Sequence, residues 1–454
     1  MMMTGFPACA AARQVPSKSE RLLEEASPLK PELAPSPNDN ASGATSKDIS
    51  HKRRHFVAMG LTAMLFIVAL RPSAEGQTFT TLYAFTGDAD GAYPWAGMIR
   101  DQAGNLYGTT LYGGNLAAVC KNGVGCGTVF KVAPNGKETV LYAFTGGLDG
   151  GVPYGPVIGD RIGNLYGATS NAGKLSDCDG LGCGTIFKLS ASGVFSVLYA
   201  FTGGVDGGNP RGVIRNATGV LYGATSGGGA YSHGTLFKID ASGTETVLHS
   251  FGSGTDGSDP GASPILDSAG NLLGATVVGG TLGFGTVYKI DPTGNETMEY
   301  SFTAANGDGY GPYNASVVSN GSYLYGVTSF GGDLSCSNGN GCGVVFKLDR
   351  NGKETVVHTF TGLDGEEPFA SLIGDPAGNL YGTTINGGTW GFGTVFKIDA
   401  MGNFSVLHNF TNGTNGHDGA YPTGALVRDA AGNLYGTTNG GGTAGFGTVF
   451  KVKP

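Results

Sequence analysis

Seven aspartates, each followed by glycine, are the first residues whose type and spacing could serve chemistry. They are Asp90, Asp149, Asp206, Asp256, Asp308, Asp364 and Asp418. An Asp-Gly pair is typical of a tight turn, because glycine tolerates a positive φ and the aspartate accepts hydrogen bonds from its own turn. The alternative is calcium, and Asp88 beside Asp90 adds a carboxylate in the first copy. Calcium takes about six to eight oxygen ligands, and the other copies lack extra carboxylates, so the pattern favours the turn and assigns no metal.

A variable residue follows each of these turns, directly after a proline. Five of these residues are aromatic or basic, and they are Trp95, Tyr154, Arg211, Tyr313 and Phe369, while Gly261 and Thr423 occupy the other two positions. Aromatic faces beside polar groups suit stacking against sugar rings or a peptide ligand. The same rings could instead pack between neighbouring repeats, and both interpretations stay open.

The cysteines form three close pairs, each in a glycine-rich segment. The pairs are Cys120/Cys126, Cys178/Cys183 and Cys336/Cys342, whereas Cys9 lies in an N-terminal segment that we expect to be removed. An even number of cysteines in an exported chain predicts disulfides. Zinc is the alternative, but it would need two further ligands, and no histidine or additional cysteine lies nearby in sequence.

Signatures of catalysis are weak, and no catalytic residue is assigned. No serine lies in a Gly-x-Ser-x-Gly elbow. Three histidines, His249, His358 and His408, occupy a repeat position that tyrosine holds elsewhere, which predicts half-exposed packing. A carboxylate pair for glycoside cleavage is an alternative, but the repeated glutamates, including Glu138, Glu245 and Glu354, are expected beside turns on the face opposite the Asp-Gly turns.

Internal repeats dominate the chain after residue 77. One phrase recurs at seven phenylalanines, which are Phe85, Phe144, Phe201, Phe251, Phe302, Phe360 and Phe410. Each repeat contains four short β-rich runs, for example 425–429, 105–110, 127–131 and 138–144, separated by Gly, Asn and Asp turns. Glycine accounts for 83 of the 454 residues, which excludes long helices because each interior glycine costs a helix about 1 kcal/mol.

The phase of the repeats predicts how they close. Residues 78–85 match the last strand of a repeat and residues 447–451 match the third, so the two segments complete one blade. We therefore expect an all-β fold over 77–454, a seven-bladed β-propeller of four-stranded antiparallel blades whose ring is closed by the N-terminal strand. A β-solenoid is the alternative, but it would need capping repeats. In a propeller, the five aromatic and basic residues would ring the channel entrance.

Charge and targeting signals point to an exported protein. Residues 1–50 form an unpatterned preamble, and 51–76 join a basic cluster to an apolar run, as in an export signal or signal anchor. Contact with a membrane is expected only through this segment, if it is uncleaved. The net charge is −8, and the repeated lysines of the Phe-Lys phrase are spread evenly, which argues against nucleic acid. A monomer is expected.

The phrases Tyr-Ala-Phe-Thr-Gly at 83–87, Gly-Asn-Leu-Tyr-Gly at 104–108 and Gly-Thr-Val-Phe-Lys at 127–131 resemble the GloVer tandem repeats of secreted bacterial proteins. The Asp-x-x-Gly-Asn-Leu-Tyr phrase is also similar to NHL-type propeller repeats. The first resemblance implies export and cell-surface association, and it supplies no established activity.

Three functions are consistent with these patterns. The first is a secreted, periplasmic or cell-surface module that binds a polysaccharide or cell-envelope ligand without chemistry and without a cofactor, unless calcium is bound. The second is a carbohydrate-active hydrolase or lyase on the same scaffold. The third is a structural or adhesive surface protein.

Overall fold

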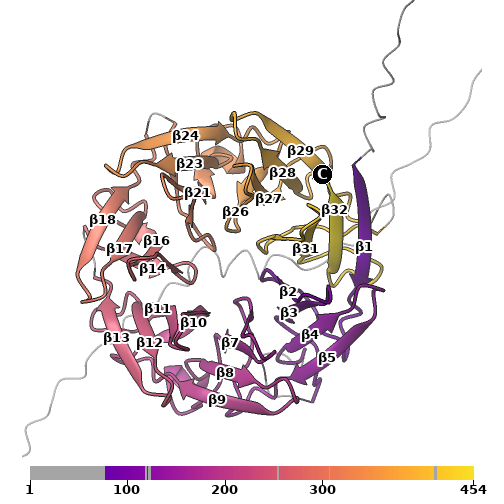
Figure 1. The fold of residues 1–454 in the computed structure, drawn as a ribbon, viewed down its shortest axis with the longest axis vertical. Coiled ribbons are helices and arrows are strands. Elements are labelled where there is room, and N and C mark those ends of the chain that lie inside the picture. Colours follow the sequence, from indigo (N-terminus) through magenta and orange to yellow (C-terminus); the bar gives the residue numbers. More distant parts are fainter. Residues whose placement is uncertain (1–76, 118–119, 121–123, 253–254, 306, 414–416) are drawn as a thin grey trace, which may run out of the picture. The chain divides into compact units, whose positions relative to one another are not determined.

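The computed structural model describes residues 77–454, apart from 118–119, 121–123, 253–254, 306 and 414–416. Seven antiparallel sheets surround a central axis (Figure 1), which confirms the predicted all-β propeller. In this part of the chain, helical structure is confined to two three-residue 3-10 turns, Cys178–Gly180 and Ser337–Gly339. No described helix has the length and apolar character needed to cross a membrane. The preamble and the export segment expected over 1–76 lie outside the described residues.

In every blade, the strands follow one another from the axis outward. The first three blades are β2 (Ile99–Arg100), β3 (Leu106–Thr110), β4 (Thr128–Val132) and β5 (Glu138–Ala143); β6 (Ile158–Gly159), β7 (Leu165–Thr169), β8 (Thr185–Leu189) and β9 (Phe195–Ala200); and β10 (Gly208–Arg215), β11 (Leu221–Gly227), β12 (Thr235–Ile239) and β13 (Glu245–Ser250). The fourth blade has β14 (Gly257–Pro260) and β15 (Ile265–Leu266) on the inside, then β16 (Leu272–Gly279), β17 (Thr286–Ile290) and β18 (Glu296–Ser301).

The remaining blades repeat this order. The fifth contains β20 (Val318–Ser319), β21 (Leu324–Thr328), β23 (Val344–Leu348) and β24 (Glu354–Thr359), with the small pair β19 (Gly309–Tyr310) and β22 (Phe330–Gly331). The sixth contains β25 (Glu366–Pro368), β26 (Ile373–Gly374), β27 (Leu380–Asn386), β28 (Thr394–Ile398) and β29 (Phe404–Asn409). The seventh contains β30 (Val427–Arg428), β31 (Leu434–Thr438), β32 (Thr448–Lys453) and β1 (Thr78–Ala84).

The ring closes in the seventh blade, as the phase of the repeats predicts. Strand β1 pairs antiparallel with β32, with Thr78 opposite Lys453 and Ala84 opposite Thr448. The pairing continues beyond the strand, because the Phe85 amide donates to the Gly447 carbonyl at 3.0 Å. This closure covers the edge of β32, which would otherwise be open to pairing with another chain.

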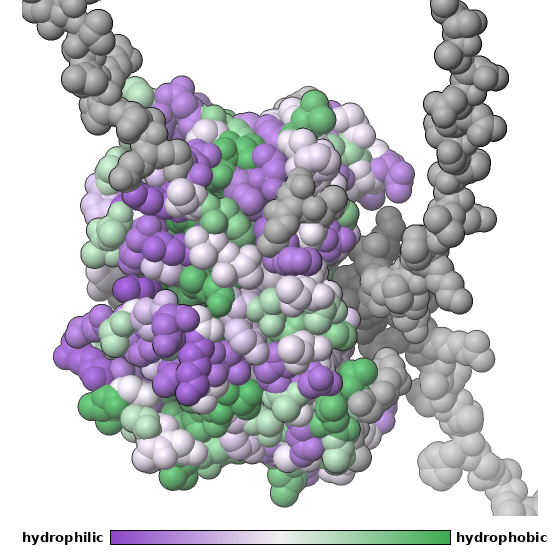
Figure 2. Space-filling view, turned by 90° about the vertical axis from the view of Figure 1, so that its right-hand side faces the viewer, coloured by the Kyte–Doolittle hydropathy of each residue, from purple (hydrophilic) through white to green (hydrophobic). Residues whose placement is uncertain are grey.

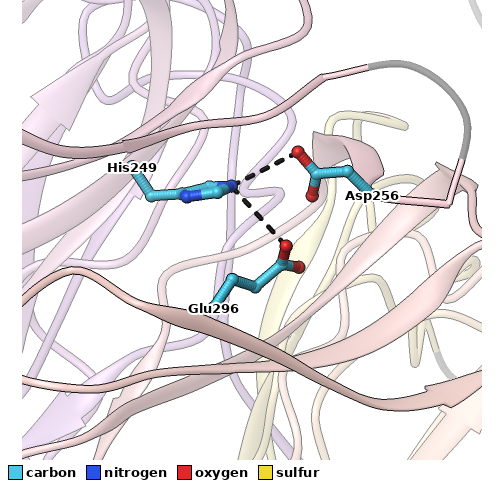
Figure 3. A group of neighbouring side chains, drawn as sticks. All are labelled: His249, Asp256 and Glu296. Atoms are coloured by element: carbon cyan, nitrogen blue, oxygen red, sulfur yellow. Dashed lines mark hydrogen bonds and ion pairs between the residues drawn. The ribbon is translucent and has the colours of Figure 1, made fainter.

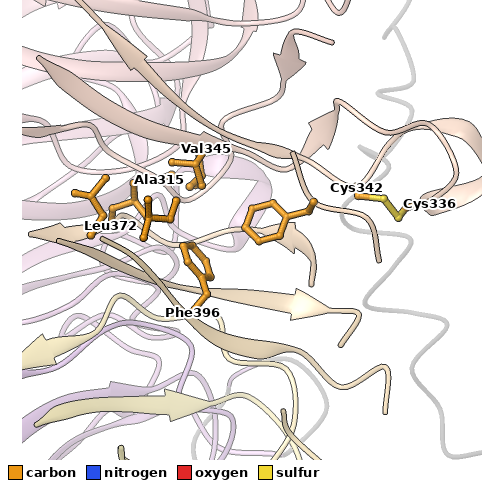
Figure 4. Packing of buried hydrophobic residues seen from close by; sticks show 10 residues of the cluster. Ala315, Cys336, Cys342, Val345, Leu372 and Phe396 are labelled. Atoms are coloured by element: carbon orange, nitrogen blue, oxygen red, sulfur yellow. A yellow bond between two sulfur atoms is a disulfide. The ribbon is translucent and has the colours of Figure 1, made fainter. Parts of the chain in front are cut away.

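The hydrophobic core consists of one cluster for each pair of neighbouring blades. Each cluster contains a ring pair that joins a repeated phenylalanine to the aromatic residue of the next blade's third strand, as in Phe85–Phe130 at 5.1 Å and Phe360–Phe396 at 5.2 Å between ring centroids. Figure 4 shows the cluster between the fifth and sixth blades, where Phe396 packs with Ala315 and Leu372. Burial of one such ring contributes about 1.5–3 kcal/mol, so the phenylalanine repeat is what holds the blades together.

Glycine in the second strand makes room for these rings. A Cβ added at Gly223 would lie 2.4 Å from Cζ of Phe237, and Gly436 has the same relation to Phe450. The glycine of the Leu-Tyr-Gly phrase is therefore required by packing, not by a turn.

A second repeated glycine precedes the third strand and has a positive φ. At Gly234, φ is 94°, and an added Cβ would lie 2.3 Å from the Thr225 carbonyl oxygen and 2.8 Å from Pro260 Cδ. We expect Gly234→Ala to lower the free energy of unfolding by more than the ~1–2 kcal/mol that a positive φ alone costs alanine. The matched control is Gly193→Ala, because Gly193 has φ 85° and nothing within 4 Å of an added Cβ. Equal losses for both variants in urea unfolding would contradict this expectation.

The three predicted disulfides are confirmed. Cys120–Cys126, Cys178–Cys183 and Cys336–Cys342 are bonded, and each closes a loop within a single glycine-rich segment. Figure 2 shows one side of the ring, on which polar and apolar side chains are mixed.

Candidate functional site

The Asp-Gly turns position the candidate binding face. After each turn the chain passes through a residue with positive φ that directly precedes the proline, for example Tyr93 (57°), Val152 (55°) and Asp259 (55°). The backbone N–H of this residue donates a hydrogen bond to a carbonyl in the glycine-rich loop of the preceding blade, as Tyr93 N–H does to the Phe446 carbonyl at 2.9 Å. A left-handed residue before proline is strained, and here the interblade hydrogen bond holds it. The proline and the variable residue follow directly in the chain.

The five predicted residues Trp95, Tyr154, Arg211, Tyr313 and Phe369 come together around the axis. The Trp95 ring lies 5.2 Å from Tyr154 and 5.7 Å from Phe369, measured between centroids. Phe369 in turn stacks on Tyr313 at 6.0 Å, and the Arg211 guanidinium lies 5.1 Å from the Tyr154 centroid. The Trp95–Phe369 contact links the first and sixth blades, whereas the other three contacts link consecutive blades. We call this group, with Asp259, the mouth.

The two remaining inner-strand positions complete the ring. The Thr423 hydroxyl donates to the Trp95 carbonyl at 2.8 Å. Gly261 lies so close to the next blade that an added Cβ would be 2.2 Å from the Tyr313 carbonyl oxygen. Small residues at these two positions therefore let the blades approach the axis, while the larger side chains fill the mouth.

Asp259 is a mouth residue that sequence reasoning missed. Its Oδ1 lies 3.7 Å from Nη2 of Arg211, an ion pair rather than a hydrogen bond. Burial raises the pKa of Asp259 above its ordinary value, and Arg211 offsets part of this rise. The signal was available, because Asp259 directly precedes Pro260 in the same place as Tyr93 precedes Pro94.

Several polar atoms at the mouth have no hydrogen-bond partner among the described residues. They are Nε1 of Trp95, Nε of Arg211 and Oδ1 of Asp259, and each atom is shielded from solvent. Leaving a buried donor unpaired costs about 1–3 kcal/mol. The mouth therefore holds unpaired polar atoms between aromatic faces, which a ligand could reach only after a side-chain movement.

The aromatic residues of the glycine-rich loops mostly pack locally. Phe446 contacts Tyr93, Phe284 contacts Tyr310 and Phe392 contacts Tyr421, with ring centroids 5.3–5.7 Å apart. Trp390 differs from them because 52% of its surface is exposed. Trp390 is therefore free to extend the binding face.

The Asp-Gly aspartates make the hydrogen bonds of a turn. Asp90 accepts from the Tyr83 hydroxyl at 2.8 Å and from the Thr86 amide and hydroxyl at 2.8 and 2.5 Å. The equivalent carboxylates of Asp149, Asp206, Asp256, Asp308, Asp364 and Asp418 also accept from the preceding outer strand and the residues after it. Asp88 is exposed, and its backbone carbonyl accepts from Gly91 and Gly114. Calcium stays the untested alternative.

The outer strands run around the circumference, so the end of each lies beside the start of the next (Figure 1). Each meeting point, which we call a rim junction, joins a Tyr or His from one strand, the following Asp-Gly aspartate, and a residue at the start of the next outer strand. This starting residue is glutamate at four junctions and phenylalanine at three, namely Glu138, Glu245, Glu296 and Glu354, and Phe79, Phe195 and Phe404.

The glutamates were expected on the opposite face from the aspartates, and that expectation is wrong. Each glutamate lies close enough to an aspartate to feel its charge, and the pairs are Asp90 with Glu138, Asp206 with Glu245 and Asp308 with Glu354. The outer strands run tangentially, so the start of each strand lies beside the aspartate that follows the preceding outer strand. Burial, and then the charge of these aspartates, raises the pKa of each of the three glutamates to about 7. The Oε1 atoms of all three are buried without a hydrogen-bond partner in the described structure.

At the phenylalanine junctions, the ring stacks on the tyrosine or histidine. Phe195 lies 3.9 Å from Tyr142, Phe404 lies 3.7 Å from His358 and Phe79 lies 3.9 Å from His408, measured between ring centroids. The predicted half-exposed packing role of His358 and His408 is therefore confirmed.

A closed ring of seven four-stranded blades with the mouth at one face defines this protein as a seven-bladed β-propeller. The chain belongs to the Gloeobacter/Verrucomicrobia repeat family, whose profile matches residues 66–214 and 209–450. The resemblance to GloVer repeats is therefore confirmed. Among proteins with curated functions, none matches the chain in sequence.

Solved structures with a similar fold are distant in sequence. The extracellular domain of a B. thetaiotaomicron protein assigned to a one component system is 10% identical with a TM-score of 0.52, covering 82% of this chain and 39% of that chain. The extracellular domain of a protein from the same organism assigned to a hybrid two component system is 15% identical with a TM-score of 0.49, covering 83% and 41%. A gluconolactonase from Xanthomonas campestris is 14% identical with a TM-score of 0.38, covering 64% and 82%. The first likeness shows the fold alone, and this chain spans about two fifths of the length of that neighbour.

Proposed function

We propose that this protein is an exported propeller that binds a carbohydrate or another cell-envelope ligand at the mouth without chemical conversion. Export is supported by three disulfides, which persist in oxidising compartments. The binding face is supported by its position, because function-bearing residues concentrate on loops held by a rigid scaffold.

The observation that carries the proposal is the convergence of aromatic rings and unpaired polar atoms at the mouth. Sugars present apolar ring faces that stack on aromatic side chains and hydroxyls that hydrogen-bond. Trp95 and Tyr154 supply adjacent rings, and a side-chain movement on binding would open the unpaired donors Nε1 of Trp95 and Nε of Arg211 to a ligand. The Arg211–Asp259 pair adds one donor group and one acceptor group for ligand hydroxyls.

We expect the Trp95→Ala, Tyr154→Ala double variant to bind about 10- to 100-fold more weakly than the unchanged protein, because each stacked ring contributes ~0.5–1.5 kcal/mol beyond its burial. The measurement is binding to an array of bacterial polysaccharides and peptidoglycan fragments, followed by titration calorimetry on the positive ones. Arg211→Gln, which keeps the aromatic rings, should also weaken binding.

The matched control is Tyr323→Ala. Tyr323 is 38% exposed and lies in the turn between β20 and β21, on the face opposite the mouth. It should leave affinity unchanged. Undiminished binding by the double variant, with its melting temperature retained, would place the ligand elsewhere. Loss of binding in Tyr323→Ala would do the same.

A further inference from the structure

We propose that the rim junction between the third and fourth blades binds a divalent transition metal ion, with zinc the best fit, through His249, Asp256 and Glu296. The site lies on the outer rim and is independent of the mouth. His249 comes from β13, Asp256 from the turn that leads into the fourth blade, and Glu296 from the start of β18. A bound ion would therefore join two blades.

The three side chains already converge on one point (Figure 3). Nε2 of His249 lies 3.3 Å from Oδ2 of Asp256 and 3.9 Å from Oε2 of Glu296. All three ligand atoms lie within 4.8 Å of one another. Tetrahedral zinc with bonds of ~2.0–2.1 Å places its ligand atoms roughly 3.3 Å apart. Small side-chain movements would therefore complete the coordination, with a fourth position left for water.

The chemistry of the three groups selects the class of ion. Imidazole nitrogen suits zinc and other transition metals, whereas calcium takes six or more oxygen ligands. Two carboxylates also balance the charge of a divalent ion. Without an ion, the two carboxylates repel each other, and Oε1 of Glu296 is buried with no hydrogen-bond partner among the described residues.

The other six rim junctions serve as an internal comparison. Three combine tyrosine with glutamate, one combines tyrosine with phenylalanine and two combine histidine with phenylalanine; in order, they are Tyr83/Glu138, Tyr199/Glu245, Tyr300/Glu354, Tyr142/Phe195, His358/Phe404 and His408/Phe79. Only the junction of His249 and Glu296 brings a histidine and two carboxylates together among the described residues.

A second substitution distinguishes the same junction. In the other six repeats, a threonine hydroxyl donates to the Asp-Gly aspartate, and these residues are Thr86, Thr145, Thr202, Thr303, Thr361 and Thr411. Here Gly252 occupies that position, and Asp256 instead accepts from the backbone amides of Gly252 and Gly257 at 2.6 and 2.7 Å. Asp256 is thus held by these backbone donors and by His249, and position 252 lacks the threonine hydroxyl of the other six repeats.

The test is zinc binding by the untagged full chain after treatment with EDTA and dialysis, measured by titration calorimetry and by elemental analysis. The unchanged protein should bind one zinc ion more than either single variant, His249→Tyr or Glu296→Phe. Loss of an outer-shell partner alone costs ~10–100-fold in affinity, so loss of a direct ligand should cost at least about 100-fold. Both variants recreate residue sets found at other junctions, so each is expected to fold.

Equal zinc affinity in the unchanged protein and in His249→Tyr would overturn the proposal, as would absence of zinc binding by the unchanged protein. Displacement of zinc by equimolar calcium would overturn the choice of a transition metal. The remaining histidines are present in every variant, so zinc held by them does not affect the difference.

A gain of binding provides the complementary test. Phe404→Glu places a glutamate beside His358 and Asp364, whose Nε2 and Oδ2 atoms are 3.0 Å apart, and should create a second zinc site. The matched control is Phe195→Glu, which adds the same carboxylate beside Tyr142 and Asp149 and should add no zinc. If both variants bound the same amount of zinc, or if Phe404→Glu bound no more zinc than the unchanged protein, a histidine with two carboxylates would not be what defines the site.

Discussion

Phe85→Ala is expected to lower the free energy of unfolding by about 3–5 kcal/mol and to release β1 before the rest of the ring unfolds. Phe85 is fully buried, its ring lies 5.1 Å from Phe130, and it follows the strand that closes the seventh blade. Strand β1 pairs with β32 alone. No turn joins these two strands, whereas every other outer strand continues directly from the third strand of its own blade.

The measurement combines urea unfolding with hydrogen exchange on peptides from β1 and β32. The matched control is Phe201→Ala, at the equivalent position of an outer strand that is joined to its blade by a turn. Both variants should lose global stability, but only Phe85→Ala should selectively speed exchange in β32. Equal protection of β32 in the two variants would show that closure does not depend on this contact.

Stability is expected to fall as the pH rises from about 4.5 to about 7. Glu138, Glu245 and Glu354 have a usual pKa of 4.5, which the fold raises to about 7. A raised carboxyl pKa means that the folded state favours the protonated form. Below pH 4.5 the three glutamates are protonated in both the folded and the unfolded state, so they do not change the free energy of unfolding. Above pH 7 they are ionised in both states, and burial of the three carboxylates lowers the free energy of unfolding by its full amount. After a discount for solvent screening, each site contributes about 1–2 kcal/mol.

The opposite trend is expected at lower pH. Hydrogen bonds from Asn105 and Tyr107 hold the pKa of Asp101 below its usual value although burial opposes them, and the same turn recurs at Asp160, Asp375 and Asp429. Stability from these lowered carboxyl pKa values is present above pH 3.8 and is lost as the pH falls below it. We therefore expect a maximum of stability between about pH 4 and 5.

The triple variant Glu138→Gln, Glu245→Gln, Glu354→Gln separates the two effects. Glutamine imitates the protonated acid, so the variant should melt at a higher temperature than the unchanged protein at pH 8 and at the same temperature at pH 4.5. Glu299→Gln is the control, because Glu299 lies on β18 but pairs with Lys289 at 3.4 Å instead of facing an Asp-Gly aspartate. An unaltered pH slope in the triple variant would refute the role of the three glutamates.

The architecture could be predicted from the sequence because each of its determinants lies within one repeat. The spacing of Phe85, Phe144 and their equivalents defines the blades, and the glycines define the turns. Residues 78–85 match the last strand of a repeat and residues 447–451 match the third strand. Because these two strands are neighbours in every other repeat, the match predicted that they complete one blade and close the ring. The cysteine pairs were readable for the same reason, because each pair closes a loop of a few residues.

The rim could not be predicted, because its contacts join different repeats through the orientation of the strands. Sequence order placed Glu138 and Asp90 at opposite ends of a blade. The tangential course of the outer strands brings them together, and that course depends on the twist of each sheet. The mouth was partly predictable: Trp95 and Tyr154 were identified from their position in the repeat, whereas Asp259 was missed because it lies before the proline.

The positions of the disulfides determine which parts of the molecule a reductant can change. The bonded cysteines are separated by 5 or 6 residues, and none of the three bonds connects one blade to another. The ring itself is held by buried rings and strand pairing, which reduction leaves intact. A reductant would therefore loosen three loops and leave the strand pairing of the blades in place, so the propeller can form before oxidation and its loops can acquire their final shape afterwards.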